Sequence, residues 1–107
     1  MIEIDLHIHS KYSDDSLLGP CTIIRKAKSK GISVIAVVDH NTIVGALETS
    51  KEASVEDILV VPGIEVRTNL GDLIGLFVKE QIDSRDFCEA VDAIKGQNGL
   101  AVLPHPL

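Results

Sequence analysis

The chain has 107 residues, a formal net charge of −6 at pH 7 and apolar residues at 45% of its positions. This length fits one domain with a single core, and no apolar run approaches the roughly 20 residues that cross a bilayer. The acidic balance and the lack of a basic cluster argue against a nucleic-acid surface on this chain taken alone. Its start lacks the basic and apolar regions of a signal peptide, so we expect a cytoplasmic protein.

The first half of the chain predicts two strands and two helices. Proline suits a first helical position and glycine a helix stop, so Gly19-Pro20 and Gly31 predict a helix that ends near Lys30. The apolar run over residues 34–38 is typical of a strand covered on both faces, and Thr42 is expected to cap a helix to about Ala53. In the first strand the period of two places Ile2, Ile4 and Leu6 on one face and Glu3, Asp5, His7 and His9 on the other.

The second half continues the alternation. We expect a strand over residues 58–66 interrupted at Pro62-Gly63, a strand over 73–78, a helix capped by Ser84, and a last strand over 100–103. Repeated strand–helix units with apolar strands predict a largely parallel sheet with helices outside it. Chemistry in such folds gathers at the carboxyl ends of the strands. Because the chain stops on a strand, we interpret it as an incomplete barrel.

All four histidines follow short apolar stretches that resemble buried strands. His7 and His9 lie two residues apart, about 6–7 Å along a strand, so their rings can converge on one ion. His40 and His105 end two later stretches, and Pro106 favours extended geometry for His105. Imidazoles together with carboxylates suit zinc, manganese or iron. The alternative is a set of hydrogen-bonded, partly buried histidines.

Several carboxylates accompany the histidines. Asp14 and Asp15 fit either ligands or an ordinary turn. Asp39 is a candidate acceptor for the spare N–H of the His40 ring, although the same segment also fits a helix-capping turn. Glu65 on a strand needs a cation or a donor, and the alternative partner is Arg67, two residues further on.

Four segments in this order resemble the motif set of the PHP (polymerase and histidinol phosphatase) family. They are Asp-Leu-His-Ile-His-Ser-Lys-Tyr-Ser-Asp-Asp-Ser, Val-Asp-His-Asn-Thr, Pro-Gly-Ile-Glu-Val and Leu-Pro-His-Pro. The resemblance covers essentially the whole chain as one domain, residues 1–107. It implies part of a distorted (β/α)7 TIM-like barrel with parallel strands. It also implies up to three divalent ions (Zn, Mn or Fe).

The resemblance also assigns roles to residues. His7 and His9 would share one ion with Glu65, Glu65 would bridge to a second ion held by His105, and Asp15 and His40 would hold the third. Asp14 instead of Asp15 would match a related variant of the motif. Asp72 stands where many members have a histidine, which leaves the affinity and identity of the second ion open. The implied catalytic residues are Glu65, His7, His9 and His40, with Asp5 and Asp39 supporting the ligands.

The activity implied by the resemblance is metal-dependent phosphoester hydrolysis. Lys11 and Arg67 are candidates to hold phosphate oxygens, although each also fits a solvated or paired charge. The substrate would be a phosphorylated small molecule or a nucleic-acid end, and the oligomeric state stays open. Members usually supply further ligands from a C-terminal half, so we expect a fragment of a protein about twice as long. The alternative function is a non-catalytic metal-binding or scaffold module.

Overall fold

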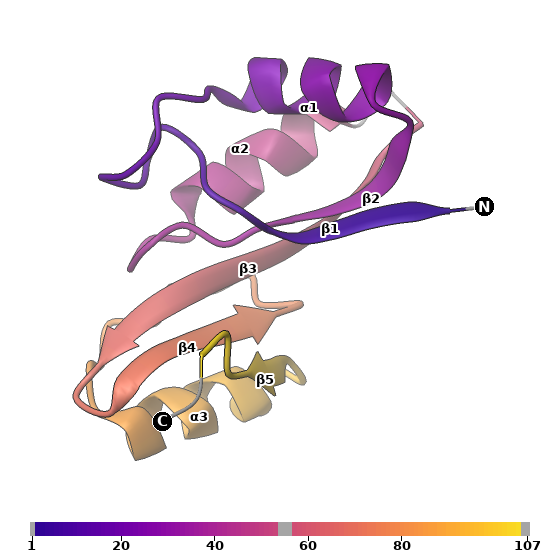
Figure 1. The fold of residues 1–107 in the computed structure, drawn as a ribbon. Helices are drawn as coiled ribbons and strands as arrows, with labels where there is room; N and C mark the ends of the chain where they lie inside the picture. Colours follow the sequence, from indigo (N-terminus) through magenta and orange to yellow (C-terminus); the bar gives the residue numbers. More distant parts are fainter. Residues whose placement is uncertain (1, 54–56, 106–107) are drawn as a thin grey trace.

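The computed structural model describes residues 2–53 and 57–105, which form five strands and three helices (Figure 1). No helix in these ranges is long and apolar enough to span a membrane. In chain order the elements are β1 (Glu3–Ile8), α1 (Pro20–Ser29), β2 (Ile32–Val37), α2 (Val44–Ala53), β3 (Leu59–Thr68), β4 (Gly71–Leu76), α3 (Phe87–Gly96) and β5 (Leu100–Val102). The fold is therefore mixed α/β, as the alternating pattern predicts.

The strands form one sheet in the order β1-β2-β3-β4-β5. β1, β2 and β3 are parallel, whereas β4 is antiparallel to both β3 and β5. The prediction of a largely parallel sheet is therefore wrong at β4. Parallel neighbours need a long crossover connection, but β3 and β4 are joined by a tight turn in which the Thr68 hydroxyl donates to the Gly71 carbonyl (2.5 Å). Gly71 adopts a φ of 123°, which a side chain would disfavour.

β3 is one continuous strand, and the expected interruption at Pro62-Gly63 is wrong. The strand instead changes partners there: residues through Pro62 pair with β2, and residues from Gly63 pair with β4. Proline has no N–H to donate, but the Pro62 carbonyl accepts from the Val78 backbone N–H (3.1 Å). A Cβ at Gly63 would lie 2.6 Å from the Gly75 carbonyl oxygen, so glycine permits the close approach of the two strands.

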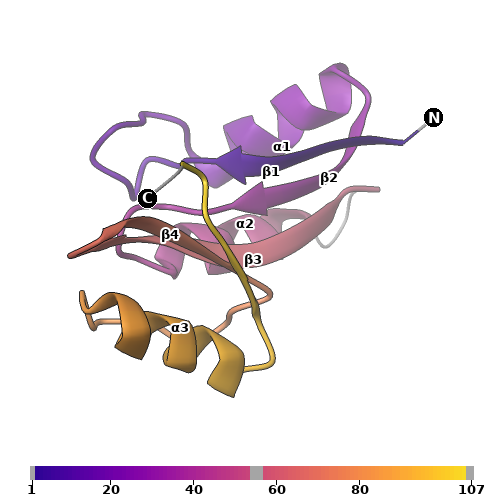
Figure 2. The ribbon, with the colours of Figure 1, turned by 60° about the horizontal axis from the view of Figure 1, so that its bottom comes forward.

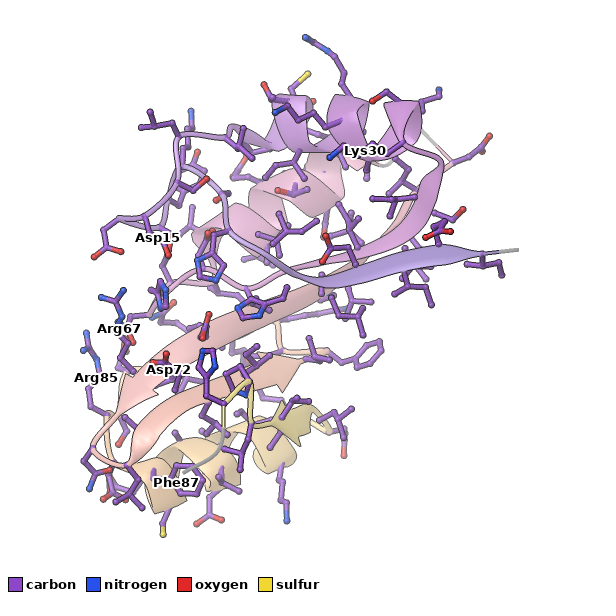
Figure 3. All side chains as sticks on the ribbon, in the orientation of Figure 1. Asp15, Lys30, Arg67, Asp72, Arg85 and Phe87 are labelled. Carbon is purple, nitrogen blue, oxygen red and sulfur yellow. The ribbon has the colours of Figure 1, made fainter. Side chains whose placement is uncertain are left out.

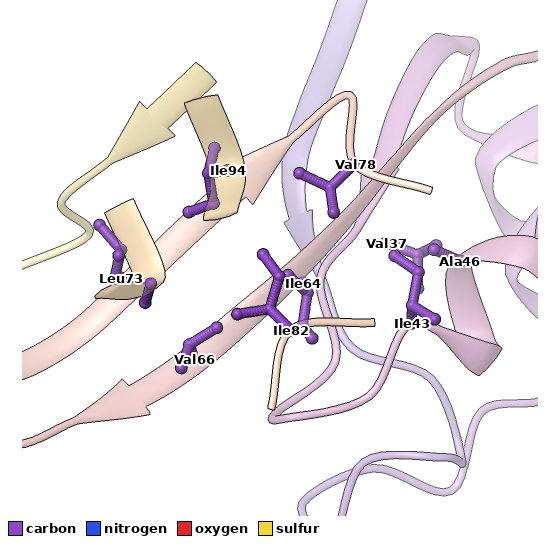
Figure 4. Close-up of a cluster of buried hydrophobic side chains, with 10 residues drawn as sticks. Val37, Ile43, Ala46, Ile64, Val66, Leu73, Val78, Ile82 and Ile94 are labelled. Atoms are coloured by element: carbon purple, nitrogen blue, oxygen red, sulfur yellow. The ribbon is translucent and has the colours of Figure 1, made fainter. Parts of the chain in front are cut away.

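One face of the sheet is covered by helices and the other is not (Figures 1 and 2). A cluster of ten buried residues joins the covered face of the sheet to α2, α3 and the segment between β4 and α3 (Figure 4). It contains Val37, Ile43, Ala46, Ile64, Val66, Leu73, Val78, Ile82, Ala90 and Ile94. A second buried cluster lies beneath α1 and includes Ile23, Ala27 and Ile35. Burial of these side chains supplies the main drive for folding.

The uncovered face carries its own apolar cluster, which includes Ala36, Val38, Val61, Ile74 and Leu76. Cross-strand pairing places Glu65 opposite Ile74 and Arg67 opposite Asp72. Residues directly opposite each other share a face, so these polar side chains lie on this inner face as well. The sheet is thus a half-barrel whose inner face is apolar along its middle and polar at one end.

α3 begins at a different cap from the one expected. The carboxylate of Asp86, not the hydroxyl of Ser84, accepts from the Glu89 backbone N–H (3.0 Å). Ser84 supports the turn before it, because its hydroxyl accepts from the Asp86 N–H and donates to the Glu89 carboxylate. At α2, Thr42 accepts from the Val44 N–H (3.2 Å), so it lies next to the helix start as expected.

β1 departs from simple alternation. Asp5 lies opposite Ile35 and Ile8 opposite Val37, with a register shift between them. Ile35 and Val37 both face the helices, so Asp5 and Ile8 also do, although they are three positions apart in the chain. A β-bulge of this kind adds a residue and reverses the alternation beyond it. The expectation that Asp5 and His7 share a face is therefore wrong, and His7 and His9 turn toward Glu65.

Candidate metal centre

Glu65 lies at the middle of the candidate site. Its side chain is 2% exposed, and its Oε1 lies 2.9 Å from His7 Nε2 and 2.8 Å from His9 Nε2. A carboxylate removed from water in this way needs donors or a cation. The three residues also offer ligand atoms within 4.8 Å of one another, as one ion requires. The bulge in β1 and the inner face of β3 thus produce the first group of potential ligands.

His9 links this group to a second one. Its Nδ1 lies 3.0 Å from the Asp15 carboxylate, which also lies 3.1 Å from His40 Nε2. The rings of His9 and His40 are 4.5 Å apart between centroids. His9, Asp15 and His40 offer ligand atoms within 4.8 Å of one another. Side chains from the ends of β1 and β2 and from the loop after β1 therefore meet at one place.

The charges of this group shift two pKa values in the metal-free protein. Burial lowers the pKa of His9, but the hydrogen bonds and negative charges of Asp15 and Glu65 outweigh it, and the pKa is raised overall. The hydrogen bond with His9 lowers the pKa of Asp15 to about 2, with support from Ser13 and the charge of His40. Asp15 is thus a carboxylate at neutral pH and available as a ligand.

A third group contains His40, Glu65 and Asp72, again within 4.8 Å. Asp72 is the second residue of β4. Because β4 runs against β3, its beginning lies beside the end of β3, where Glu65 is found. The reversal of β4, which sequence reasoning missed, is what brings Asp72 to His40 and Glu65. Figure 3 shows Asp72 near Arg67, its partner across the β3–β4 pair.

Asp39 does not contact the His40 ring as expected. Both of its carboxylate oxygens accept hydrogen bonds from Ser10, one from the backbone N–H and one from the hydroxyl, each at 2.5 Å. His40 Nδ1 is buried and has no hydrogen-bond partner within the described residues. Asp39 therefore fixes the loop that follows β1 and does not orient the His40 ring.

The backbone aligns His40 beside Glu65. The two residues form an isolated parallel bridge, in which the Glu65 N–H donates to the Asp39 carbonyl and the Asn41 N–H to the Glu65 carbonyl, both 2.9 Å. Asn41 has a φ of 59°, a conformation that asparagine tolerates better than most residues. The Ser13 hydroxyl accepts from the His40 N–H (3.0 Å). These contacts hold His40 from both the first loop and β3.

Asp5 and His105 do not belong to the ligand groups of this centre. The Asp5 carboxylate accepts from the His7 backbone N–H (3.1 Å), so it supports the bulge and not the imidazole. His105 follows β5 and is exposed, and it belongs to none of the ligand groups found among the described residues. Pro106 lies outside those residues.

Two cationic side chains were expected to reach phosphate. Arg67 does not pair with Glu65, because its guanidinium lies 3.3 Å from the exposed carboxylate of Asp14. Its backbone N–H donates to Asn41 (3.0 Å). The Lys11 ammonium lies 5.5 Å from the centre of the Tyr12 ring. Both cations are exposed, and Arg67 lies opposite Asp72 in the sheet, close to the centre.

Sequence reasoning missed several supporting residues. Ser10, Ser13 and Asn41 hold the ligand loops, but isolated serine and asparagine residues in loops give no specific signal. Arg85 lies in the segment between β4 and α3. Its backbone carbonyl accepts from the Asn69 N–H (2.9 Å), which brings the segment before α3 to the β3–β4 turn.

The residues fit divalent cations on chemical grounds. Imidazole nitrogens and carboxylate oxygens are the ligands that zinc, iron and manganese use in proteins. The buried Glu65 carboxylate has two histidines as partners, and the buried His40 Nδ1 has none within the described residues. A bound cation would neutralise the carboxylate charge and give the imidazole nitrogen a partner. The fold and this centre define an α/β protein with a histidine- and carboxylate-rich site at one end of a half-barrel.

Comparison with known proteins identifies the family. The model described as PHP domain matches residues 5–100, so the chain belongs to the PHP domain family. An uncharacterized protein of Methanocaldococcus jannaschii is 43% identical over 116 aligned residues, which cover 98% of this chain and 68% of that protein. The 3′,5′-nucleoside bisphosphate phosphatase of Chromobacterium violaceum is 34% identical over 71 residues, 66% of this chain and 25% of that one.

A solved structure shows the same fold. It is an amidohydrolase from Chromobacterium violaceum with bound sulfate and no metal, and it superposes with a TM-score of 0.65 at 26% identity. The superposition covers 88% of this chain and 32% of the other. The chain thus spans between a quarter and about two thirds of the length of these relatives.

Proposed function

We propose that the protein is a metal-dependent phosphoesterase. The observation that supports this most directly is the convergence of His7 and His9 on the buried Oε1 of Glu65, at 2.9 and 2.8 Å. Membership of the PHP domain family and similarity to a protein named as a bisphosphate phosphatase agree with it. The proposed substrate is accordingly a phosphorylated small molecule or a nucleic-acid end.

We assign the roles of the residues as follows. His7, His9, Asp15, His40, Glu65 and Asp72 would hold the ions, and Glu65 is suited to serve two of them because it belongs to two of the groups. Divalent ions, when bound, acidify water and neutralise phosphoryl oxygens. The chain itself contributes the positions of its ligands, through the β1 bulge and the loop contacts of Asp39 and Ser13. We propose His105 as a further ligand that would need to move toward the centre.

Arg67 is proposed to bind a phosphate oxygen. The guanidinium geometry suits phosphate, and its present partner Asp14 is an exposed carboxylate. Exposed ion pairs of this kind contribute only about 0–1 kcal/mol, so a phosphate group can displace Asp14 at little cost. Lys11 is a weaker candidate because its ammonium lies near Tyr12, at the surface.

We further propose that the half-barrel is the N-terminal part of a distorted (β/α)7 barrel and that full activity belongs to a longer polypeptide. The relatives are longer than this chain, which supports the idea. Activity would be measured with p-nitrophenyl phosphate, its bis-ester and short oligonucleotides, with and without added Mn²⁺. We expect negligible turnover from residues 1–107 and metal-dependent turnover from a chain extended to the length of the relatives. An extended chain without metal and without turnover would favour the scaffold alternative.

A further inference from the structure

Two carboxylates at the centre lie close together, and neither pairs with a lysine or arginine among the described residues. Glu65 and Asp72 offer oxygen atoms within 4.8 Å of each other and of a His40 nitrogen. Like charges at this separation repel, most strongly where water is partly excluded, and Glu65 is buried while Asp72 is half-buried. This arrangement favours the uptake of a positive ion.

The described residues do not provide that positive charge. Arg67 lies directly opposite Asp72 in the sheet, yet its guanidinium contacts Asp14 instead. The side chain of Asp72 has no hydrogen bond or ion pair with any described residue. The Oε1 atom of Glu65 is taken by His7 and His9, whereas its other oxygen has no such partner among the residues described. His40 adds a buried Nδ1 that also lacks a partner there.

The two groups that share Glu65 differ in chemistry. His7, His9 and Glu65 offer two nitrogens and one oxygen, whereas His40, Glu65 and Asp72 offer one nitrogen and two oxygens. Nitrogen-rich sets suit zinc, whereas carboxylate-rich sets suit manganese and magnesium, which are harder ions. We propose that Asp72 makes the position it shares with His40 and Glu65 less selective for Zn²⁺ over Mn²⁺ or Mg²⁺ than the position formed by His7, His9 and Glu65.

This inference rests on the metal centre proposed above but not on its phosphoesterase activity, so its test uses binding alone. The chain is stripped of metal with a chelator and loaded with one equivalent of Zn²⁺. Mn²⁺ is then titrated while the free ion is followed by electron paramagnetic resonance, and Zn²⁺ affinity is measured separately by competition with a chromophoric chelator. We expect Mn²⁺ to bind beside the zinc already present.

Variants separate the two positions. Asp72→Asn keeps the side-chain shape and should weaken Mn²⁺ binding at least about tenfold. The affinity for the first Zn²⁺ should stay within about threefold of its original value. His7→Ala should weaken Zn²⁺ and spare Mn²⁺. Asp72→His should raise the affinity of the second position for Zn²⁺. The matched control is Asp92→Asn, an exposed aspartate on α3, which should change neither affinity.

The inference is overturned if Asp72→Asn leaves Mn²⁺ affinity unchanged, or if it weakens Zn²⁺ and Mn²⁺ equally, as one shared position would require. Melting curves of the metal-free variants show whether each one folds, and Asp72→His provides an independent readout if Asp72→Asn is unstable. Two-ion binding without phosphoester hydrolysis would remove the proposed function and leave this inference standing.

Discussion

The carboxylate of Asp39 accepts two hydrogen bonds from Ser10, and both residues are fully buried. The contact joins the loop after β1 to the end of β2. It therefore holds two segments that carry His9 and His40, although neither Ser10 nor Asp39 belongs to a ligand group.

Ser10→Ala should destabilise the protein. The variant removes the hydroxyl donor and leaves one oxygen of the buried Asp39 carboxylate without its partner. This should lower the free energy of unfolding by about 2–3 kcal/mol. In a domain of this size that corresponds to a fall in melting temperature of roughly 10 °C. Ser29→Ala is the control, because Ser29 is exposed and its hydroxyl donates to the nearby Lys26 carbonyl. Equal melting temperatures for the two variants would contradict the importance of the Ser10–Asp39 contact.

Gly45→Ala should damage the same contact from the helix side. A Cβ at Gly45 would collide with the Asp39 carboxylate and the Ser10 hydroxyl, so the hydrogen-bonded pair must move. Overpacking of this kind costs about 1–3 kcal/mol. Gly96→Ala is a suitable control because a Cβ there meets nothing within 4 Å. The measurement is the urea midpoint of each variant, and we expect Gly45→Ala alone to lower it substantially.

Glu65→Gln should abolish the metal-dependent turnover of the active, extended chain while leaving the fold largely intact. Glutamine has nearly the same volume but lacks the charge that two ion positions would share. We expect turnover to fall by more than the 10–100-fold that is typical when a residue hydrogen-bonded to a metal ligand is replaced. Activity and circular dichroism are measured together, with Glu80→Gln at an exposed position as control. Retained turnover in Glu65→Gln would show that the carboxylate charge is not required.

Removal of bound metal should lower the melting temperature. Ions that bind only the folded chain stabilise it by about 2.7 kcal/mol at one hundred times their dissociation constant, or roughly 10 °C here. The protein is melted with and without chelator, and then after re-addition of Zn²⁺ or Mn²⁺. A chain with His7, His9 and Glu65 all replaced by alanine should show no chelator effect. An identical chelator effect in that chain would place the ions elsewhere.

The pH dependence of stability should change sign with metal. In the metal-free protein the pKa of His9 is raised above 6.5, so its contribution to stability is complete below about pH 6.5 and is lost as pH rises through the raised value. Metal needs neutral histidine, so the metal-loaded protein should gain stability over the same rise. Melts at about pH 6 and about pH 8.5 test both statements. His9→Gln should remove the metal-free effect.

The sequence was sufficient for the elements whose signals are local. The helix after Gly19-Pro20, the buried run in β2 and the position of Glu65 on a strand follow from proline, glycine and apolar patterning. The family was also accessible, because four short motifs in order are specific, and the match over residues 5–100 confirms it.

Other features depend on tertiary pairing and could not be predicted. The bulge between Asp5 and Ile8 changes which face His7 occupies, yet the sequence shows regular alternation there. β4 runs antiparallel to β3 because only a short turn joins the two strands. The residues of that turn are also compatible with a longer connection, so the sequence does not reveal the direction of β4. Asp39 was expected to bond to its neighbour His40 because adjacency in sequence suggested it, whereas its partner Ser10 is 29 residues away.

β3 pairs with β2 along its first half and with β4 along its second half, so it joins two structural units. His7, His9, Asp15 and His40 come from the unit before β3, and Asp72 comes from the unit after it, with Glu65 on the strand itself. An ion held by His40 and Asp72 would therefore cross-link the two units. Its loss would reduce the cooperativity of unfolding, because each unit could then open without the other.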